Sequence, residues 1–406
     1  MVALSCESLE SVHGSYLEQG GRKSRRVSGW GQKNWFKSIG CCGGATWPSR
    51  LLQSSLQSLL SQSSQDLADF VWPEEERPTI PHNDYRRDRE LPVIDLSGLQ
   101  GGSEATKLRL AKRIAAACSE WGFFQLINHG IPVAELDEVQ MQTRRFFELP
   151  MEHKQRAMTL ETANASNVYG YGLNTTGYKY AGRPWIERFQ CSWSPKSNLR
   201  EQAQRLLEGQ AFQDFQTAVE SFCSGAEKLA KLTLELCALG LGLSPDTFSK
   251  HMNPSHSIAR LNYYPACPTP DLTLGLGAHT DPYTLTLLHQ CQVGGLQVCK
   301  DGKWITVKPR RGAYVVNVGD NLQAWTNGRF KSVEHRAVLN DKVPRLSLVF
   351  FYAPPLETVI TAPDAIIQAD GKRRYKSFTW AEYLNFLKRQ NFEKGKNERW
   401  VEGFAL

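Results

Sequence analysis

From about residue 256 onward, the chain consists of short β-patterned runs with no helical segment between them. The runs are "SIARLNYYPA", "YTLTLLHQ", "GLQVCK", "KWITVKP", "GAYVVNVGD", "SVEHRAVLN" and "RLSLVFFYAPP". Gly, Pro, Asn and Asp separate them, and the Asp-Gly pair in "KDGK" (300–303) is typical of a tight hairpin. A parallel α/β sheet would need helices between its strands, so this spacing favours a sandwich or jelly roll.

The part of the chain before these runs is mainly helical. "SEATKLRLAKRIAAACSEWG" has apolar residues at helical spacing, with Ser103 as the N-cap and Gly122 as the stop. Residues 133–159 and 199–242 also have a helical pattern, whereas "FFQLINHG" reads as a short buried strand. A last helix, "TWAEYLNFLKRQNFE", follows the β-runs. The expected fold class is therefore mainly β with flanking α.

Residues 1–66 differ in composition from the rest of the chain. They are rich in Ser, Gly and Gln, contain the basic cluster "GRKSRRVSG" and have few acids. Low apolar content without a period indicates a disordered leader, and the same composition also fits a plastid transit peptide. We expect three parts: the leader 1–66, a helical and mixed region 67–245, and a β-rich region 246–406 that includes the C-terminal helix.

The net charge of +7 is concentrated at the two ends of the chain. Residues 1–65 contribute +4 and residues 371–400 contribute +6, which leaves −3 for the remainder. Binding along DNA or RNA needs a basic face on the folded body, so we expect no nucleic-acid partner. No run approaches the roughly 18 apolar residues of a membrane span. The ten cysteines are scattered and no secretory signal precedes them, which predicts reduced thiols and a cytoplasmic location, with a plastid location left open by the leader.

His279 and Asp281 stand two residues apart in "GLGAHTDPYTLT". On a strand, residues i and i+2 project from the same face, so this imidazole and carboxylate can reach one point. The pair alone is common in sequences and indicates only a solvated strand end. His335, in "FKSVEHRAV", lies 54 residues after Asp281 on another β-run that can face the pair. Two imidazoles and one carboxylate are the ligand set of non-haem Fe(II) oxygenases, which keeps coordination positions open for other molecules.

Arg345 and Ser347 form "RLS" at the start of the apolar run "RLSLVFFYAPP". They too stand at i and i+2, so a guanidinium and a hydroxyl share one face. An Arg inside an apolar segment needs a partner, and its planar fork binds a carboxylate through two parallel hydrogen bonds. Asn262 and Tyr264 in "LNYYP" place two more polar groups on one face of another run. Together these residues predict a site for a bound dicarboxylate.

"NYYP", "HTD", the distal His and "RLS", in this order and spacing, resemble the plant 2-oxoglutarate- and Fe(II)-dependent dioxygenases. The resemblance covers roughly residues 70–400 and includes "VIDLSG" and "WGFFQLINHGI". It implies a double-stranded β-helix (jelly-roll) core with a helical N-terminal region. It also implies that Fe(II), 2-oxoglutarate and O2 take part, with ascorbate as a supporting reductant. The residues it assigns are His279, Asp281 and His335 for iron, Arg345, Ser347 and Tyr264 for the far carboxylate of 2-oxoglutarate, and Asn262 near its iron-bound end.

Three longer stretches are similar to gibberellin 20-oxidases, namely "FVWPEEERP", "RPWIERFQCSWS" and "NYYPACPTPDLTLGLGAHTDPYTLTLLHQCQVGGLQV". This resemblance implies oxidation of carbon 20 of a gibberellin precursor, which is a small apolar carboxylic acid. The chain departs from that subfamily at "RPWIER", where the subfamily usually has "LPWKET", and at Thr280, where it usually has Cys.

Two other hypotheses remain open at this point. A dioxygenase that acts on flavonoids or another hormone would keep every cofactor residue and differ only around the substrate. A small-molecule-binding barrel without catalysis is the alternative from a different class. Loss of any one of His279, Asp281, His335 or Arg345 would favour it, and all four are present.

Overall fold

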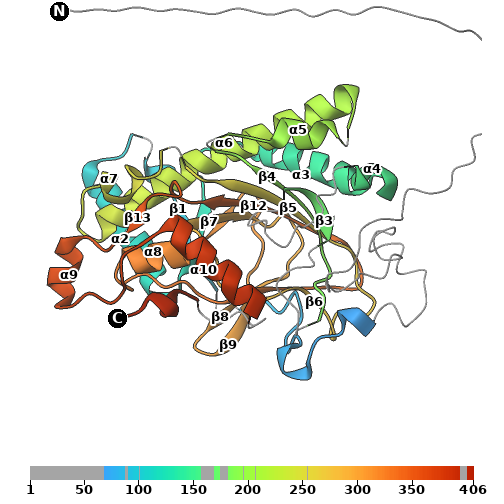
Figure 1. Ribbon diagram of the computed structural model, residues 1–406. Helices are drawn as coiled ribbons and strands as arrows, with labels where there is room; N and C mark the ends of the chain where they lie inside the picture. The colour runs from blue at the N-terminus through green and yellow to red at the C-terminus, as the bar shows by residue number, and fades with distance from the viewer. Residues whose placement is uncertain are drawn as a thin grey trace, which may run out of the picture. The chain divides into compact units, whose positions relative to one another are not determined.

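In the computed structural model, two β-sheets form the centre of the molecule and helices cover the larger sheet (Figure 1). The large sheet has the strand order β1-β2-β10-β7-β12-β5-β4-β3, and the small sheet has the order β6-β11-β8-β9. The structure describes residues 68–86, 90–99, 101–156, 169–173, 182–194, 196–205, 207–253, 255–393 and 400–406.

All seven predicted β-runs form strands. They are β5 (Ile258–Tyr264), β7 (Leu285–His289), β8 (Leu296–Lys300), β9 (Lys303–Thr306), β10 (Tyr314–Val318), β11 (His335–Val338) and β12 (Arg345–Tyr352). The predicted hairpin joins β8 to β9, with Lys300 paired to Lys303. Asp301 and Gly302 between them both have positive φ, 50° and 72°, which a two-residue turn of this kind requires.

One strand of the small sheet, β6 (Leu274–His279), contains Gly275 and Gly277 and lies beside β11. A Cβ on Gly275 would lie 2.6 Å from the ring of Tyr264 in the large sheet. Glycine is therefore required here, because it lets the two sheets approach each other closely.

The N-terminal region contributes four strands to the large sheet. They are β1 (Val93–Asp95), β2 (Phe123–Ile127), β3 (Gly170–Leu173) and β4 (Glu187–Ser192). β2 pairs with β10 and β4 pairs with β5, both antiparallel, whereas β1 runs parallel to β2. Both regions expected from the sequence, 67–245 and 246–406, thus contribute strands to one sheet. The boundary between these regions stays a prediction.

Helices from the N-terminal region cover one face of the large sheet (Figure 1). The predicted N-cap is confirmed, because Ser103 accepts a hydrogen bond from the Thr106 N–H, and Gly122 has a φ of 64° after the helix ends. Phe146, Phe189 and Phe215 pack with ring centroids 5.1–5.7 Å apart and join this layer to the sheet. The helices of this region are α2 (Glu104–Glu120), α3 (Val133–Phe147), α4 (Met151–Gln155), α5 (Leu199–Gln204) and α6 (Gly209–Gly240), and the short α7 (Asp246–Ser249) begins the next region.

The C-terminal part adds the predicted last helix and several short elements. Thr379 and Glu382 form a capping box, in which each side chain accepts the other's backbone N–H. The remaining elements are α8 (Asp320–Trp325), β13 (Val359–Ile360), α9 (Asp364–Asp370), β14 (Phe378–Thr379), α10 (Trp380–Glu393), and the 3-10 helices η1 (Ala68–Phe70), η2 (Glu74–Glu76), η4 (Ser97–Leu99) and η5 (Trp400–Phe404).

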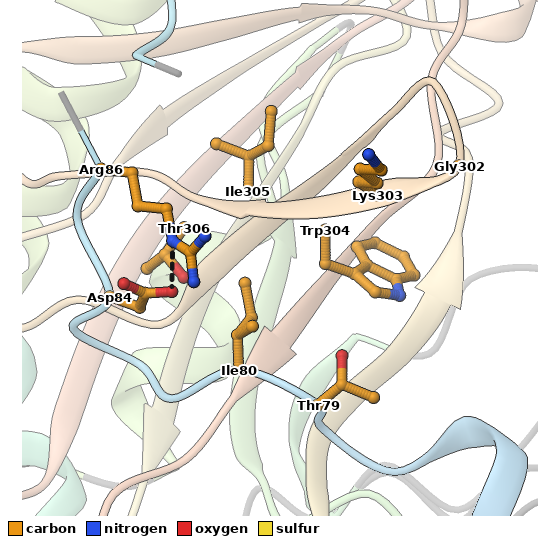
Figure 2. A pocket seen from close by; sticks show the side chains of 9 residues that line it. All are labelled: Thr79, Ile80, Asp84, Arg86, Gly302, Lys303, Trp304, Ile305 and Thr306. Carbon is orange, nitrogen blue, oxygen red and sulfur yellow. Dashed lines mark hydrogen bonds and ion pairs between the residues drawn. The ribbon is translucent and has the colours of Figure 1, made fainter. Parts of the chain in front are cut away.

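Residues 77–86, which contain a turn at His82–Asn83, cross one face of the small sheet. Gln297 Nε2 donates to Ile80 O at 3.0 Å, and Thr306 Oγ1 donates to Pro81 O at 3.2 Å. Between this segment and the β8–β9 hairpin lies a cavity of about 280 Å³, where Asp84 and Arg86 form an ion pair (Figure 2). None of the candidate site residues lines this cavity, and we assign it no role.

The expected fold class is confirmed: the chain is mainly sheet with flanking helices, in a double-stranded β-helix arrangement. Among the described residues, no helix is long and apolar enough to cross a membrane. The predicted leader, residues 1–66, lies outside the described residues.

Candidate metal centre

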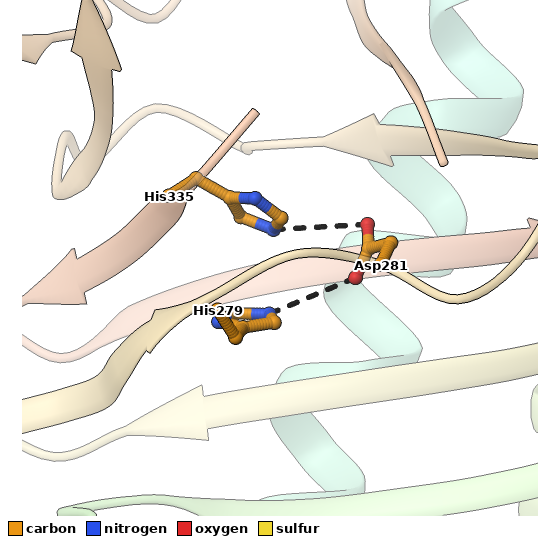
Figure 3. Close-up of side chains that lie close together, drawn as sticks. All are labelled: His279, Asp281 and His335. Carbon is orange, nitrogen blue, oxygen red and sulfur yellow. Dashed lines mark ion pairs between the residues drawn. The ribbon is translucent and has the colours of Figure 1, made fainter. Parts of the chain in front are cut away.

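His279, Asp281 and His335 lie together at one end of the small sheet (Figure 3). His279 ends β6, His335 begins β11, and the two residues are direct partners in the antiparallel pairing. Their ring centroids are 4.2 Å apart. His279 Nε2 lies 3.6 Å from Asp281 Oδ1, and His335 Nε2 lies 3.7 Å from Asp281 Oδ2. The three residues therefore offer two nitrogens and a carboxylate to one point, as predicted from their spacing.

The position of Asp281 differs from the prediction in one respect. β6 ends at His279, so Asp281 comes from the loop that follows and not from the same strand face. Pro282 comes directly after it and lacks the backbone N–H that a continuing strand would use. The loop turns the carboxylate toward the two imidazoles.

Backbone carbonyls orient both imidazole rings. His279 Nδ1 lies 2.8 Å from Gly277 O, and His335 Nδ1 lies 3.2 Å from Val333 O. A carbonyl oxygen can only accept, so each Nδ1 carries the proton and each Nε2 presents its lone pair to the centre. Metal-binding histidines in proteins are held in this way.

Two residues that the motif did not indicate hold the carboxylate of Asp281. Thr286 Oγ1 donates to Asp281 Oδ2 at 2.7 Å, and Asn317 Nδ2 donates to the same oxygen at 2.9 Å. Asn317 stands inside the apolar run "YVVNV", and a single polar residue in a fully buried strand is the signal that could have identified it.

The protonation states of this cluster suit a metal ligand set. Burial, followed by the neighbouring His335, lowers the pKa of His279 to about 4. Burial alone would raise the pKa of Asp281, but His335, His279 and the donors from Asn317 and Thr286 outweigh it and hold that pKa below its usual range. At neutral pH His279 is uncharged and Asp281 is ionised, which are the forms that bind a metal ion.

Thr280 lies between His279 and Asp281 and connects this site to the C-terminal helix α10. Its Oγ1 donates to Asp320 Oδ2 at 3.2 Å, and Tyr383 Oη donates to the same oxygen at 2.7 Å. Asp320 is fully buried, and this burial raises its pKa to about 6. The hydroxyl of Thr280 is thus turned toward Asp320 and α10.

The predicted dicarboxylate residues meet on two adjacent strands of the large sheet, β5 and β12. In the β5–β12 register, Arg345 pairs with Tyr264 and Ser347 pairs with Asn262. Asn262 Nδ2 donates to Ser347 Oγ at 3.2 Å, and the guanidinium of Arg345 lies 5.0 Å from the Tyr264 ring centre. All four side chains are buried.

The buried and unpartnered side chain of Arg345 is the strongest evidence that these four residues bind a ligand. It is 3% exposed, yet its Nε and Nη1 have no hydrogen-bond partner among the described residues, and neither has Asn262 Oδ1. A buried guanidinium without an anion is costly, so a bound carboxylate fits this place. Gly295 leaves room for the Arg345 side chain: its φ is 143°, and a Cβ there would lie 2.9 Å from Arg345 Cδ.

Comparisons with known proteins agree with this geometry. A family model for the 2OG-Fe(II) oxygenase superfamily matches residues 255–354, and one for the non-haem dioxygenase in morphine synthesis N-terminal region matches residues 91–210. Gibberellin 20 oxidase 1 of Arabidopsis thaliana is 37% identical over 336 residues, covering 82% of this chain and 86% of its own. Gibberellin 20 oxidase 3 of Oryza sativa subsp. japonica is 37% identical over 344 residues, covering 82% of this chain and 90% of its own.

Solved structures show the same relationship. The crystal structure of JOX2 in complex with 2OG, Fe and JA matches with a TM-score of 0.73 and 29% identity, covering 87% of this chain and 98% of JOX2. The rice dioxygenase for auxin oxidation matches with a TM-score of 0.62 and 27% identity, covering 78% of this chain and all of that one. The chain therefore belongs to the 2OG-Fe(II) oxygenase superfamily and is a 2-oxoglutarate-dependent dioxygenase that uses Fe(II), 2-oxoglutarate and O2.

Proposed function

We propose that this dioxygenase is gibberellin 20-oxidase-like and oxidises carbon 20 of a C20 gibberellin precursor. The observation that carries the proposal is the 37% identity to gibberellin 20 oxidases over 82% of the chain, together with a complete set of candidate cofactor residues. The substrate is then a small, apolar carboxylic acid. The free thiols of the described cysteines support a reducing compartment, which we take to be the cytoplasm, or a plastid if the leader is a transit peptide.

In this proposal His279 and His335 hold iron through Nε2, and Asp281 holds it through its carboxylate. The backbone carbonyls of Gly277 and Val333 fix the two rings, and the donors on Asp281 Oδ2 fix the carboxylate. When bound, iron and 2-oxoglutarate supply the oxidation of an unactivated C–H bond by O2, with release of succinate and CO2.

The residues of the large sheet bind and orient the cosubstrate. Arg345 donates in parallel to the far carboxylate of 2-oxoglutarate, and Ser347 and Tyr264 bind the same end. We assign Asn262, which pairs with Ser347 across the two strands, to the iron-bound end of 2-oxoglutarate. This assignment is supported by Nε and Nη1 of Arg345, which have no hydrogen-bond partner among the described residues.

The proposal is tested by incubating the full chain with Fe(II), 2-oxoglutarate and ascorbate and a panel of C20 gibberellins and flavonoids. Mass spectrometry should detect gibberellin products oxidised at carbon 20, with succinate formed in step. Oxidation of flavonoids alone would replace the gibberellin assignment. Tight binding of these compounds with no turnover at all would favour a non-catalytic binding barrel instead.

A second candidate function is oxidation of another hormone-like acid. It is favoured by the structural similarity to JOX2, whose complex contains JA, and by the departure from "LPWKET" at "RPWIER". The same panel extended to jasmonic acid distinguishes the two, because only one substrate class should give a product at low micromolar concentration.

Replacing Asn317 with alanine should weaken Fe(II) binding by about 10- to 100-fold, because one of the two donors that orient Asp281 is lost. Titration with Fe(II) against a chelator measures this. Asn340→Ala is the matched control: the side chain of that buried Asn bonds to the backbone of its own turn, at Lys342 and Val343. Equal iron affinity in the two variants would contradict the role of Asn317.

A further inference from the structure

The loop that carries Asp281 lies against the junction between β10 and α8. The backbone N–H of Asp320 donates to Asp281 O at 2.8 Å. The N–H of Gly319 donates to Thr284 O at 3.2 Å. A Cβ on Gly319 would lie 2.0 Å from Tyr283 O and 2.9 Å from Asp281 O, so only glycine allows this close approach. The junction therefore fixes the backbone of the loop from one side.

The side chain of Asp320 contacts the residue before Asp281. Thr280 Oγ1 donates to Asp320 Oδ2 at 3.2 Å, and Asp320 is only 1% exposed. Asp320 thus holds two consecutive residues of the loop, Thr280 through its carboxylate and Asp281 through its backbone N–H. Fixing two neighbouring residues restricts the backbone rotation of this segment, so the direction of the Asp281 side chain depends on Asp320.

Tyr383, in the C-terminal helix α10, holds the carboxylate of Asp320. Its Oη donates to Asp320 Oδ2 at 2.7 Å, which is a shorter bond than the one from Thr280. Tyr383 is fully buried, and its ring centroid lies 5.4 Å from that of Phe378 and 5.5 Å from that of Phe404. A buried carboxylate is costly unless donors bind it, and close packing restricts this donor to one position. The carboxylate therefore cannot move without breaking a charge-assisted hydrogen bond.

A second contact joins α10 to the same loop. The ring centroid of Trp380 lies 5.8 Å from that of Tyr283, which is two residues beyond Asp281. Trp380 also stacks on Tyr383, with ring centroids 6.0 Å apart. The helix therefore reaches the loop on both sides of Asp281, before it through the Asp320 carboxylate and after it through Tyr283.

We propose that Asp320 and Tyr383 are positioning residues of the metal centre. Tyr383 fixes the carboxylate of Asp320, and Asp320 holds the ligand Asp281 so that its carboxylate faces the two imidazoles. The inference deepens the proposed function and rests on it for the three iron ligands. It also gives a role to Thr280, one of the places where the chain departs from gibberellin 20-oxidases.

The test measures Fe(II) binding to the full chain without cosubstrate, by anaerobic titration against a chelator. Tyr383→Phe and Thr280→Val each remove one hydroxyl that donates to Asp320 and nearly keep the side-chain shape. Each should weaken Fe(II) binding by about 5- to 10-fold, which is less than the effect of Asn317→Ala, because both act on Asp281 through a further residue. Thr280→Ser keeps the hydroxyl and should bind Fe(II) as the unmodified protein does.

The double variant Thr280→Val/Tyr383→Phe tests whether both residues act through Asp320. Residues that share one partner have effects that do not multiply, so the loss of Fe(II) affinity in the double variant should be smaller than the product of the two single losses. A loss equal to that product would overturn the common route through Asp320.

Tyr171→Phe is the matched control. Tyr171 is also fully buried, and its Oη donates at 2.7 Å to a buried carboxylate, that of Glu187, but it lies on the edge strand β3 of the large sheet. Tyr171→Phe and Tyr383→Phe should both lower the free energy of unfolding of the metal-free protein, because each loses a bond to a buried charge. Only Tyr383→Phe should lose Fe(II) affinity. Equal Fe(II) affinity in these two variants would overturn the inference.

His335→Ala, titrated in parallel, separates this inference from the ligand assignment on which it rests. Loss of Fe(II) binding in His335→Ala, with normal binding in Tyr383→Phe and Thr280→Val, would overturn the positioning roles and leave the ligands in place. Normal Fe(II) binding in His335→Ala would overturn the ligand assignment and this inference with it.

Discussion

Replacing His335 with alanine should abolish high-affinity Fe(II) binding and lower turnover by more than about 100-fold. Changes to residues that only orient a metal ligand already cost 10- to 100-fold, so loss of a ligand should cost more. The fold should survive, because His335 is the first residue of β11 and its ring packs against Phe123 and His279 at the edge of the metal centre. Iron titration and the rate of succinate formation measure the first effect, and circular dichroism measures the second.

The control for this substitution is His251→Ala. His251 lies beside Trp325 and takes no part in the metal centre, so its iron affinity and turnover should match those of the unmodified protein. Wild-type iron affinity in His335→Ala would contradict the ligand assignment, whatever its activity.

Replacing Arg345 with methionine should weaken binding of the cosubstrate without destabilising the fold. The substitution removes both parallel bonds to the far carboxylate, so the KM for 2-oxoglutarate should rise about 100-fold or more. The protein without cosubstrate should be as stable as before, or more stable by about 1 kcal/mol, because a buried guanidinium with unpartnered Nε and Nη1 is replaced by an apolar chain of similar length. Kinetics and chemical denaturation measure the two effects.

Arg336→Met serves as the control, because it should destabilise the fold without weakening cosubstrate binding. Arg336 is also buried, but its Nε donates to Gln297, its Nη1 to Glu76 O, and its guanidinium lies 4.1 Å from the Trp304 ring centre. Its loss should lower the free energy of unfolding and leave the KM for 2-oxoglutarate unchanged. A destabilised Arg345→Met with normal KM would show that Arg345 is structural.

Much of the fold follows from the sequence because local signals agree with tertiary packing. The β-runs, the Asp-Gly hairpin, the Ser103 cap and the Gly122 stop each have a local physical cause, and each appears in the structure. The pairing of β2 with β10, and the parallel pairing of β1 with β2, could not be derived in this way. These contacts join distant segments, and no local pattern specifies which strand a run will pair with.

The candidate site shows the same division. Residue types and spacing indicated the metal ligands His279, Asp281 and His335, because imidazoles and a carboxylate at this spacing are typical of a metal site. They also indicated Arg345, because a guanidinium in an apolar strand needs an anionic partner. The residues that orient them were not indicated. Thr286 reaches Asp281 only because the loop after His279 turns back, and Asn317 reaches it only through the register of β10 with β7. Both depend on tertiary geometry that motif spacing does not contain.

The pairing of β2 with β10 also affects how the chain is made. Phe123–Ile127 is synthesised about 190 residues before Tyr314–Val318, the strand that covers its antiparallel edge. At typical rates of synthesis this delay lasts roughly 10 to 40 s, during which an apolar strand edge stays open on the nascent chain. Such an edge is a template for wrong pairing, so newly made chains should depend on chaperones. A sudden rise in temperature should therefore cause chains that are still being made to aggregate before it inactivates the folded enzyme.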